Sequence, residues 1–401
     1  MGKNLAQEGL GSKEWKTLSK FMKIFFVGQL LGLTTLNSIL TYLGISNNGL
    51  QISYKLLRKK ISNKLIIKIF EILFEKQISQ KMQEMQIKHR SNFSRELVTV
   101  VLDDSVFRQW LDSLKAEKNY MGYYGKFFSG QYGRVLYGLK VVTLGLSIDN
   151  VFYPLYLGMV KKYLKTDKEQ PENAINVACN LVRKWGTFIK RNNLNLLKTN
   201  NLHFSCDNGY NNIKLSNSCK ENGLIFVSVP KKTEKVVIEK QEIKLKDLIE
   251  QRFISKEKSH QEKSEKPFIM RIRAVYLAHQ KEVVLLLFRL NNSKKVSVIY
   301  CTDVCIFSKT LRRHWFQRTY IEQFFRLLKH SMKIQQSNSR NKAMFEEKLL
   351  CFFFIALHIQ KMLRFCKKNQ PKNFKKYGFE TLQKTCRRDS SFTDLLQGFA
   401  S

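Results

Sequence analysis

Acidic residues are scarce in this sequence. Its 401 residues include 32 Asp and Glu against 70 Lys and Arg, which gives a formal net charge of +38 and a pI of about 9.9. A charge of this size repels itself in the compact state and favours a polyanionic partner. Because the basic residues are spread along the chain, nucleic acid is favoured over a membrane surface. Genome composition can explain a preference for Lys over Arg, but it does not explain the scarcity of acids.

Zinc-binding patterns and membrane spans are also missing. None of the eight cysteines belongs to a Cys-x-x-Cys pair, so we expect reduced thiols and no zinc site. Residues 24–45 have the length of about 20 that a membrane span needs, but they contain several polar side chains and predict a pair of soluble helices. Residues 351–359 are too short to span and predict a buried helix. The polar N-terminal residues predict no secretory signal.

The most informative segment is WFQRTYIEQFFRLLKHSMKIQQ, residues 315–336. Arg318, Glu322 and Lys329 follow one another at intervals that place them near one face of a helix, and Trp315 lies one turn earlier on that face. A carboxylate between two cations suits a site where a metal ion meets a phosphate. The alternative is a solvated surface ion pair of little energetic value.

Two earlier segments end in carboxylates. Residues 96–105 form an apolar, β-branched run that ends in Asp103 and Asp104, and residues 202–210 form a second run that ends in Asp207. Acids at the carboxyl ends of buried strands are candidates for a site at the edge of an α/β sheet, although a single one is more often a turn or cap residue. Successive side chains on a strand point to opposite faces, so only one of Asp103 and Asp104 can join the site.

The segment around Glu322 resembles the bacterial insertion-sequence transposases of the DDE class that carry a Tyr-Arg-Glu-Lys signature. Trp315, Arg318, Glu322 and Lys329 occur at the spacing of that signature, with Trp in place of Tyr. The flanking YIEQFFRLLK is also similar to the family's sequence at this place. The Trp keeps a large ring with a hydrogen-bond donor but loses the phenol.

The acidic motifs are similar to those of the same family. Residues 103–105 match its Asp-x-Thr/Ser motif, and residues 207–210 match its Asp-x-Gly-Tyr motif. The resemblance covers roughly residues 95–360. We take Asp103 as the first acid because it is the Asp of the Asp-x-Ser motif. Asp104 remains the alternative.

The resemblance implies a DNA transposase that cuts and joins DNA ends by two-metal chemistry with Mg²⁺ or Mn²⁺. Asp103, Asp207 and Glu322 would be the catalytic metal ligands. The DNA-binding residues would be Trp315, Arg318, Lys329 and Tyr210. The expected partner is double-stranded DNA, both transposon ends and target, bound by a homodimer in the bacterial cytoplasm near the nucleoid. The alternatives are a metal-dependent DNA nuclease that cuts without joining, and a domesticated DNA-binding protein with an inactive site.

The expected fold is α/β: a ribonuclease-H-like catalytic core interrupted by a β-rich insertion and preceded by a helical N-terminal domain. The resemblance implies this fold, and the pattern of elements permits it. The expected parts are a helical DNA-binding domain at 1–95, the first part of the core at 96–222, the insertion at 223–310, the second part of the core at 311–366 and a tail at 367–401.

Local patterns predict the elements within these parts. The expected helices are 14–30, 35–44, 64–82, 171–191 and 210–221. The expected strands are 98–103, 138–148, 151–159, the run ending at Asp207, 224–229, 234–239, 268–277, 282–290 and 295–301. Residues 138–148 and 151–159 are expected to form a hairpin through Asp149 and Asn150, and residues 255–266 a polar surface loop.

Overall fold

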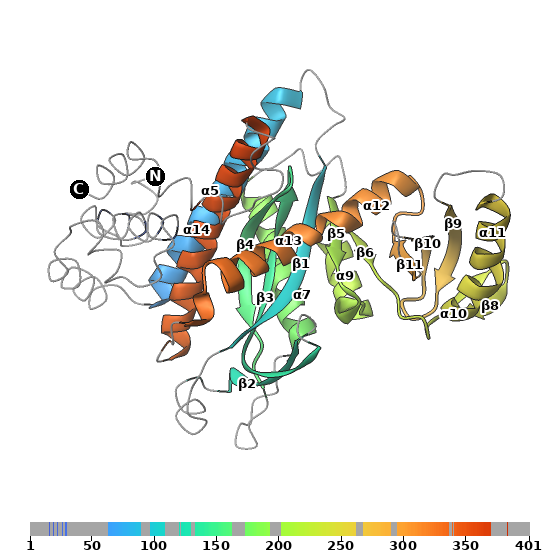
Figure 1. Ribbon diagram of the computed structural model, residues 1–401, viewed down its shortest axis with the longest axis horizontal. Helices are drawn as coiled ribbons and strands as arrows, with labels where there is room; N and C mark the ends of the chain where they lie inside the picture. The colour runs from blue at the N-terminus through green and yellow to red at the C-terminus, as the bar shows by residue number, and fades with distance from the viewer. Residues whose placement is uncertain are drawn as a thin grey trace.

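The structure is a computed structural model (Figure 1). It describes residues 63–89, 97–108, 122–129, 133–162, 173–192, 202–261, 268–289, 295–336 and 341–369, together with isolated residues elsewhere. The helices expected at 14–30 and 35–44 and the tail at 367–401 lie mostly or wholly outside the described residues.

The described part of the chain is an α/β fold built on one mixed sheet of eleven strands. Their hydrogen-bonded order is β2-β3-β1-β5-β6-β11-β10-β9-β7-β8, and β4 pairs with β3. The strands are β1 (Val98–Arg108), β2 (Tyr124–Ser129), β3 (Arg134–Ile148), β4 (Val151–Met159), β5 (Leu202–Cys206), β6 (Leu224–Ser228), β7 (Lys235–Ile238), β8 (Gln241–Lys244), β9 (Ile269–Tyr276), β10 (Lys281–Arg289) and β11 (Val296–Cys301).

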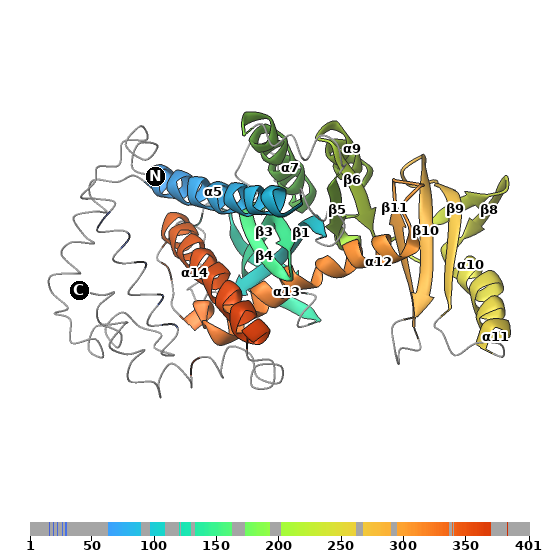
Figure 2. The same ribbon diagram turned by 90° about the horizontal axis from the view of Figure 1, so that it is seen from above.

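Helices cover both faces of this sheet (Figure 2). α7 and α9 pack on one face, and α12 and α13 cross the other face against β1. The long helices α5 and α14 lie side by side against β4. The helices are α5 (Asn63–His89), α7 (Ala174–Arg191), α9 (Ile213–Glu221), α10 (Leu245–Leu248), α11 (Ser255–Gln261), α12 (Ser308–Gln317), α13 (Thr319–Arg326) and α14 (Lys342–Asn369). Among the described helices, none combines the length and the apolar character of a membrane span.

The helix expected at 64–82 is confirmed as part of α5. Its buried side chains recur at intervals of three and four residues, from Ile66 through Phe70 and Phe74 to Ile78. This spacing gives one apolar stripe along the helix. The stripe joins the main hydrophobic core, so α5 packs against the sheet rather than standing apart from it.

The hairpin between β3 and β4 is confirmed. Asp149 and Asn150 form its two-residue turn with φ angles of 59° and 62°. Positive φ at both positions matches the right-handed twist of the strands, and Asp and Asn tolerate it better than other non-glycine residues. This turn sets the register of β4 on β3 from Ile148 to Gly145, where the register shifts.

The first expected strand is longer than predicted. β1 continues past Asp103 to Arg108, because Ser105 to Phe107 keep pairing with β3 and bury Val106 and Phe107. The two acids therefore lie within a strand and not at its end. In contrast, β5 ends at Cys206, and Asp207 follows it directly, as predicted.

The region after β6 also differs from the prediction in part. Residues 255–261 form α11 and not a polar loop. The cause is a buried ion pair, since Arg289 on β10 donates through its Nε to both carboxylate oxygens of Glu257 at 2.8 Å. β6 itself pairs in parallel with β5 and antiparallel with β11, so one sheet runs from β1 into the β-rich region.

A close approach of β3 to β4 at Gly145 gives a stability prediction. A Cβ atom there would lie 2.3 Å from the backbone oxygen of Tyr153 and 2.7 Å from the ring of Phe152. We expect Gly145→Ala to lower the free energy of unfolding by about 2 kcal/mol or more, measured by urea denaturation. Gly209→Ala is the control, because nothing lies within 4 Å of its added Cβ. Equal stability of both variants would contradict the strand packing described here.

Candidate active site

The pairing of two parallel strands brings the first two acids together. β1 and β5 are in register with Leu102 opposite Cys206, so Asp103 and Asp207 are the next residues on neighbouring strands. The side chain of Asp207 also accepts a hydrogen bond from the backbone N–H of Asn208 at 2.7 Å and thereby begins a short 3₁₀ turn. This turn fixes the Asp207 carboxylate at the carboxyl end of β5.

The third acid comes from a helix that differs from the prediction. The single helix expected from 315 to 336 is divided: α12 ends at Gln317, α13 begins at Thr319, and residues 327–331 form a π-helical turn. Arg318 joins the two α-helices, and Glu322 lies one turn later. The π-helical turn carries Lys329, and such widened turns frequently occur at functional sites.

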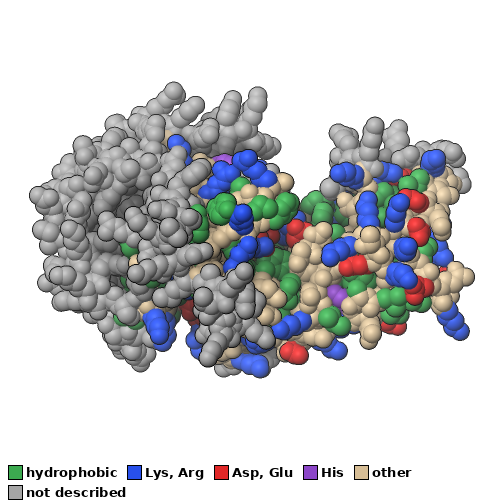
Figure 3. Space-filling view, turned by 90° about the horizontal axis from the view of Figure 1, so that it is seen from below, with side chains coloured by type: hydrophobic (Ala, Val, Ile, Leu, Met, Phe, Trp, Pro, Cys, Tyr) green, Lys and Arg blue, Asp and Glu red, His purple; other side chains and the backbone are tan. Residues whose placement is uncertain are grey.

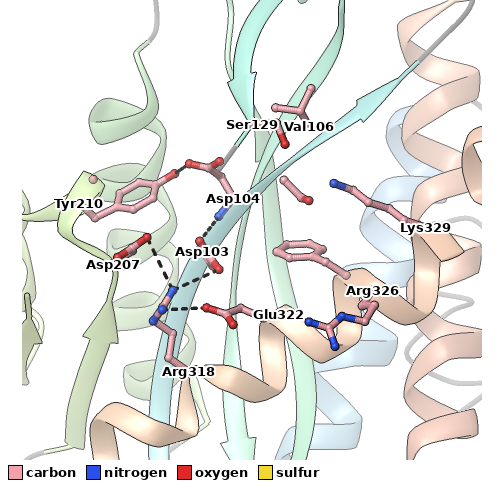
Figure 4. A pocket seen from close by; sticks show the side chains of 13 residues that line it. Asp103, Asp104, Val106, Ser129, Asp207, Tyr210, Arg318, Glu322, Arg326 and Lys329 are labelled. Atoms are coloured by element: carbon pink, nitrogen blue, oxygen red, sulfur yellow. Dashed lines mark hydrogen bonds and ion pairs between the residues drawn. The ribbon is translucent and has the colours of Figure 1, made fainter. Parts of the chain in front are cut away.

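These segments enclose a pocket of about 460 Å³ (Figure 4). Charged side chains of both signs face it, and Arg318, Glu322 and Lys329 all line it, as their helical spacing predicted. The charged lining residues are Asp103, Asp104, Asp207, Glu322, Arg318, Arg326 and Lys329.

The guanidinium of Arg318 lies among three carboxylates. Its Nη2 lies 2.8 Å from Glu322 Oε1, while its Nη1 is 3.6 Å from Asp103 Oδ2 and 3.8 Å from Asp207 Oδ2. All three contacts are ion pairs, and the one to Glu322 is the shortest. Figure 4 shows Arg318 rising from the helix into the space between the three acids. One cation thus holds together three carboxylates from segments far apart in the sequence.

Asp103 is the deepest of the three acids. Its side chain is 15% exposed, against 48% for Asp207 and 42% for Glu322. Burial is the largest influence and raises the pKa of Asp103 to about 7, although Arg318 opposes the shift. A buried carboxyl with a raised pKa gains from a nearby cation, because positive charge favours its ionised form.

Asp104 points away from this group. It accepts a hydrogen bond from the hydroxyl of Tyr210 at 2.6 Å, and Lys140 lies 3.0 Å from the same oxygen. The opposite directions of Asp103 and Asp104 follow the alternation expected in a strand. The geometry therefore joins Asp103 to Asp207 and Glu322, and assigns Asp104 to a different set of partners.

Tyr210 and Trp315, which we expected to contact DNA, pack against other parts of the protein. Tyr210 is 2% exposed, and its bond to Asp104 ties the turn after β5 to β1. Trp315 does not line the pocket and packs edge-on against Phe288 of β10. Trp315 belongs to α12, which packs over β5, β6 and β11.

The remaining basic residues lie on the α13 side of the pocket. Lys329 is 7% exposed and lies over the ring of Phe107, with 5.3 Å between its Nζ and the ring centroid. Burial lowers the pKa of Lys329 to about 8. Arg326 was not singled out from the sequence, although it follows Glu322 by four residues and so shares its face.

A hydrogen-bond network joins the β-rich region to the turn that carries Asp207. Asn211 donates to the hydroxyl of Tyr276 at 2.5 Å and to Glu234 at 3.1 Å, and it accepts from the hydroxyl of Tyr300 at 2.6 Å. Tyr276 and Tyr300 come from β9 and β11. No motif in the sequence marks this network, because its members are spread over the chain.

As the side chains stand, no three His, Cys, Asp or Glu residues within the described ranges come close enough together to hold a metal ion. Arg318 separates Asp103, Asp207 and Glu322 from one another. Comparison of the chain with protein-family models gives no match, and comparison with curated proteins finds no similar sequence. The residues of the pocket therefore carry the functional argument.

The raised pKa of Asp103 predicts a pH-dependent stability in metal-free buffer. The native state holds the Asp103 proton between the usual pKa near 3.8 and about 7, so this group's stabilising contribution is lost as the pH rises through that window. We expect Asp103→Asn to be as stable as the parent near pH 4, and more stable near pH 8 by up to about 4 kcal/mol, the free energy that corresponds to the rise of the pKa from 3.8 to about 7. Urea denaturation in EDTA measures the difference. A variant less stable than the parent at pH 8 would show that Arg318 outweighs burial.

Proposed function

We propose that this protein is a DNA transposase that cuts and joins DNA ends at the pocket between β1, β5 and α13. The observation that supports this function is the convergence of Asp103, Asp207 and Glu322 around one cation. Three acids that converge from separate segments suit metal-assisted phosphodiester chemistry better than they suit a surface ion-pair network.

The strand order supports a ribonuclease-H-like core. The order β4-β3-β1-β5-β6 has β3 antiparallel to both β1 and β4, while β5 is parallel to β1 and β6 is parallel to β5. The first acid is on β1, the second follows β5, and the third is on a helix that packs against β1. The β-rich region between β6 and α12 then corresponds to the proposed insertion, and α5, the helix described before β1, belongs to the proposed N-terminal domain.

The donor set fits Mg²⁺ or Mn²⁺. Asp103, Asp207 and Glu322 offer only carboxylate oxygens, the ligands that these hard cations prefer, and they already surround one positive charge. When bound there, the metal would polarise the scissile phosphate and lower the pKa of an attacking water or 3′-hydroxyl.

The basic residues of the pocket would position the DNA strand. Arg318 can release its carboxylate partners and grip a phosphate through its planar, multidentate guanidinium. Arg326 and Lys329 line the same pocket and would neutralise the flanking phosphates. The side chain of Lys329 is mostly buried, so it would contact a phosphate only within the pocket.

Basic side chains are scattered over the described part of the face shown in Figure 3. Blue Lys and Arg side chains outnumber the red acidic ones on the described part of this face, in keeping with the net charge of +38. A surface of this kind attracts the phosphate backbone without reading its sequence. Transposon ends and target DNA could both be held in this way, by a homodimer that brings two ends together.

Loss of single carboxylate charges tests the function. Asp103→Asn, Asp207→Asn and Glu322→Gln keep the shape of each side chain but remove one negative charge. We expect each to reduce Mg²⁺-dependent cleavage of DNA carrying the element's ends by at least about 10²-fold, while the affinity for that DNA stays within about twofold. Gel assays measure cleavage and strand transfer, and fluorescence anisotropy measures binding.

Asp104→Asn is the matched control, because Asp104 bonds to Tyr210 and Lys140 and not to Arg318. It should retain cleavage far better than Asp103→Asn. If Asp104→Asn is inactive and Asp103→Asn cleaves normally, the first acid has been assigned wrongly. If the parent protein cleaves but never joins a 3′-hydroxyl to target DNA, it is a nuclease. DNA binding without any cleavage would indicate an inactive, DNA-binding protein.

A further inference from the structure

The hairpin of β2 and β3 exposes large apolar side chains. Phe128, Val135 and Tyr137 are 62%, 56% and 54% exposed, an unusual degree for aromatic and branched residues. The register places Phe128 opposite Val135 and Lys126 opposite Tyr137, so these four side chains share one face of the hairpin. We call these four residues the hairpin face.

The hairpin face is aromatic and basic, without acids. Lys126 lies over the ring of Tyr137, with 5.2 Å between its Nζ and the ring centroid, and the exposed Arg134 precedes Val135. No Asp or Glu occurs from residue 118 to residue 148, while the same stretch contains seven aromatic and four basic residues. Tyr124 extends the aromatic surface by stacking on Tyr137.

The hairpin adjoins the candidate active site. Ser129, the last residue of β2, lines the pocket together with Val106 of β1. Phe107, whose ring lies beneath Lys329, pairs with Leu139 of β3. A DNA strand that leaves the pocket on this side would therefore meet the hairpin. In Figure 3, hydrophobic and basic side chains adjoin near the middle of the face seen from below, the direction in which β2 extends in Figure 1.

Charge decides between the possible occupants of this face. A second copy of the chain, docked face to face, would bring the lysines and arginines of two acid-free hairpins together. Unpaired nucleotides fit better, since their bases stack on exposed aromatic rings and their phosphates pair with neighbouring cations. In an intact duplex the bases stack on one another and are not available to the rings of Phe128 and Tyr137. Binding of duplex phosphates alone would therefore leave the exposure of these rings unexplained.

We propose that the hairpin face binds unpaired nucleotides of the DNA strand beside the pocket, with Phe128 and Tyr137 as stacking platforms. This inference rests on the proposed function, because it takes the pocket to be a DNA-processing site. Lys126 would contact a phosphate of the same nucleotides.

Binding in EDTA tests the inference without any cleavage. The probes are a fluorescent blunt duplex and the same duplex with a 3′ tail of about six thymidines, a length within the range that single-strand sites cover. We expect the parent protein to bind the tailed duplex more tightly. Phe128→Leu and Tyr137→Ala should each weaken binding of the tailed duplex by roughly tenfold and leave binding of the blunt duplex nearly unchanged.

Conservative variants separate stacking from simple apolar contact. Phe128→Tyr and Tyr137→Phe keep an aromatic ring and should bind the tailed duplex as the parent does. Phe307→Ala is the control for general aromatic loss, because Phe307 is 80% exposed outside the hairpin, immediately before α12. Thermal unfolding of each variant should match the parent, since the substituted side chains are exposed.

Several results would overturn the inference while the proposed function stands. One is equal affinity of the parent for the tailed and the blunt duplex. Another is an equal loss of affinity for both duplexes in Phe128→Leu or Tyr137→Ala. A third is a loss of affinity for the tailed duplex in Phe307→Ala as large as that in Phe128→Leu. A change of oligomeric state in Phe128→Leu, measured by sedimentation, would assign the hairpin face to a protein partner. If the parent binds neither probe, the proposed function fails first.

Discussion

The candidate site depends on one guanidinium among three carboxylates. Asp103, Asp207 and Glu322 repel one another, and the nearest of them to the core is buried enough for its pKa to rise to about 7. Arg318 offsets this repulsion from the centre of the group. Arg318 lies at the junction of α12 and α13, one turn before Glu322. Any metal ion or phosphate that enters the pocket must compete with, or recruit, this side chain.

The sheet supplies the precision that the site needs. Parallel pairing of β1 with β5 sets Asp103 beside Asp207, and the antiparallel strands β3 and β4 hold β1 in register from the other side. Tyr210 locks the turn after β5 to β1 through Asp104, while Asn211 binds the same turn to the β-rich region. The acid-bearing turn is therefore held from two sides.

The residues that line the pocket could be predicted from the sequence better than their arrangement in space. Helical spacing correctly brought Arg318, Glu322 and Lys329 to one pocket, and strand alternation correctly separated Asp103 from Asp104. Most strands were also predicted, because their apolar runs and turn residues are local signals. The break at Arg318, the helix at 255–261 and the burial of Tyr210 were not predicted, since they depend on tertiary contacts with Asp103, Arg289 and Asp104. β2 was missed because its exposed aromatic residues do not alternate with polar ones.

A crystal structure with Mn²⁺ and DNA would test the central claim most directly, because Mn²⁺ is located by its anomalous scattering. The account predicts Mn²⁺ held by Asp103, Asp207 and Glu322, with the Arg318 guanidinium moved from the carboxylates to a DNA phosphate. Lys329 and Arg326 should then lie beside the same strand. The account would be contradicted if Arg318 still bridged the three carboxylates while Mn²⁺ and DNA were bound elsewhere on the protein.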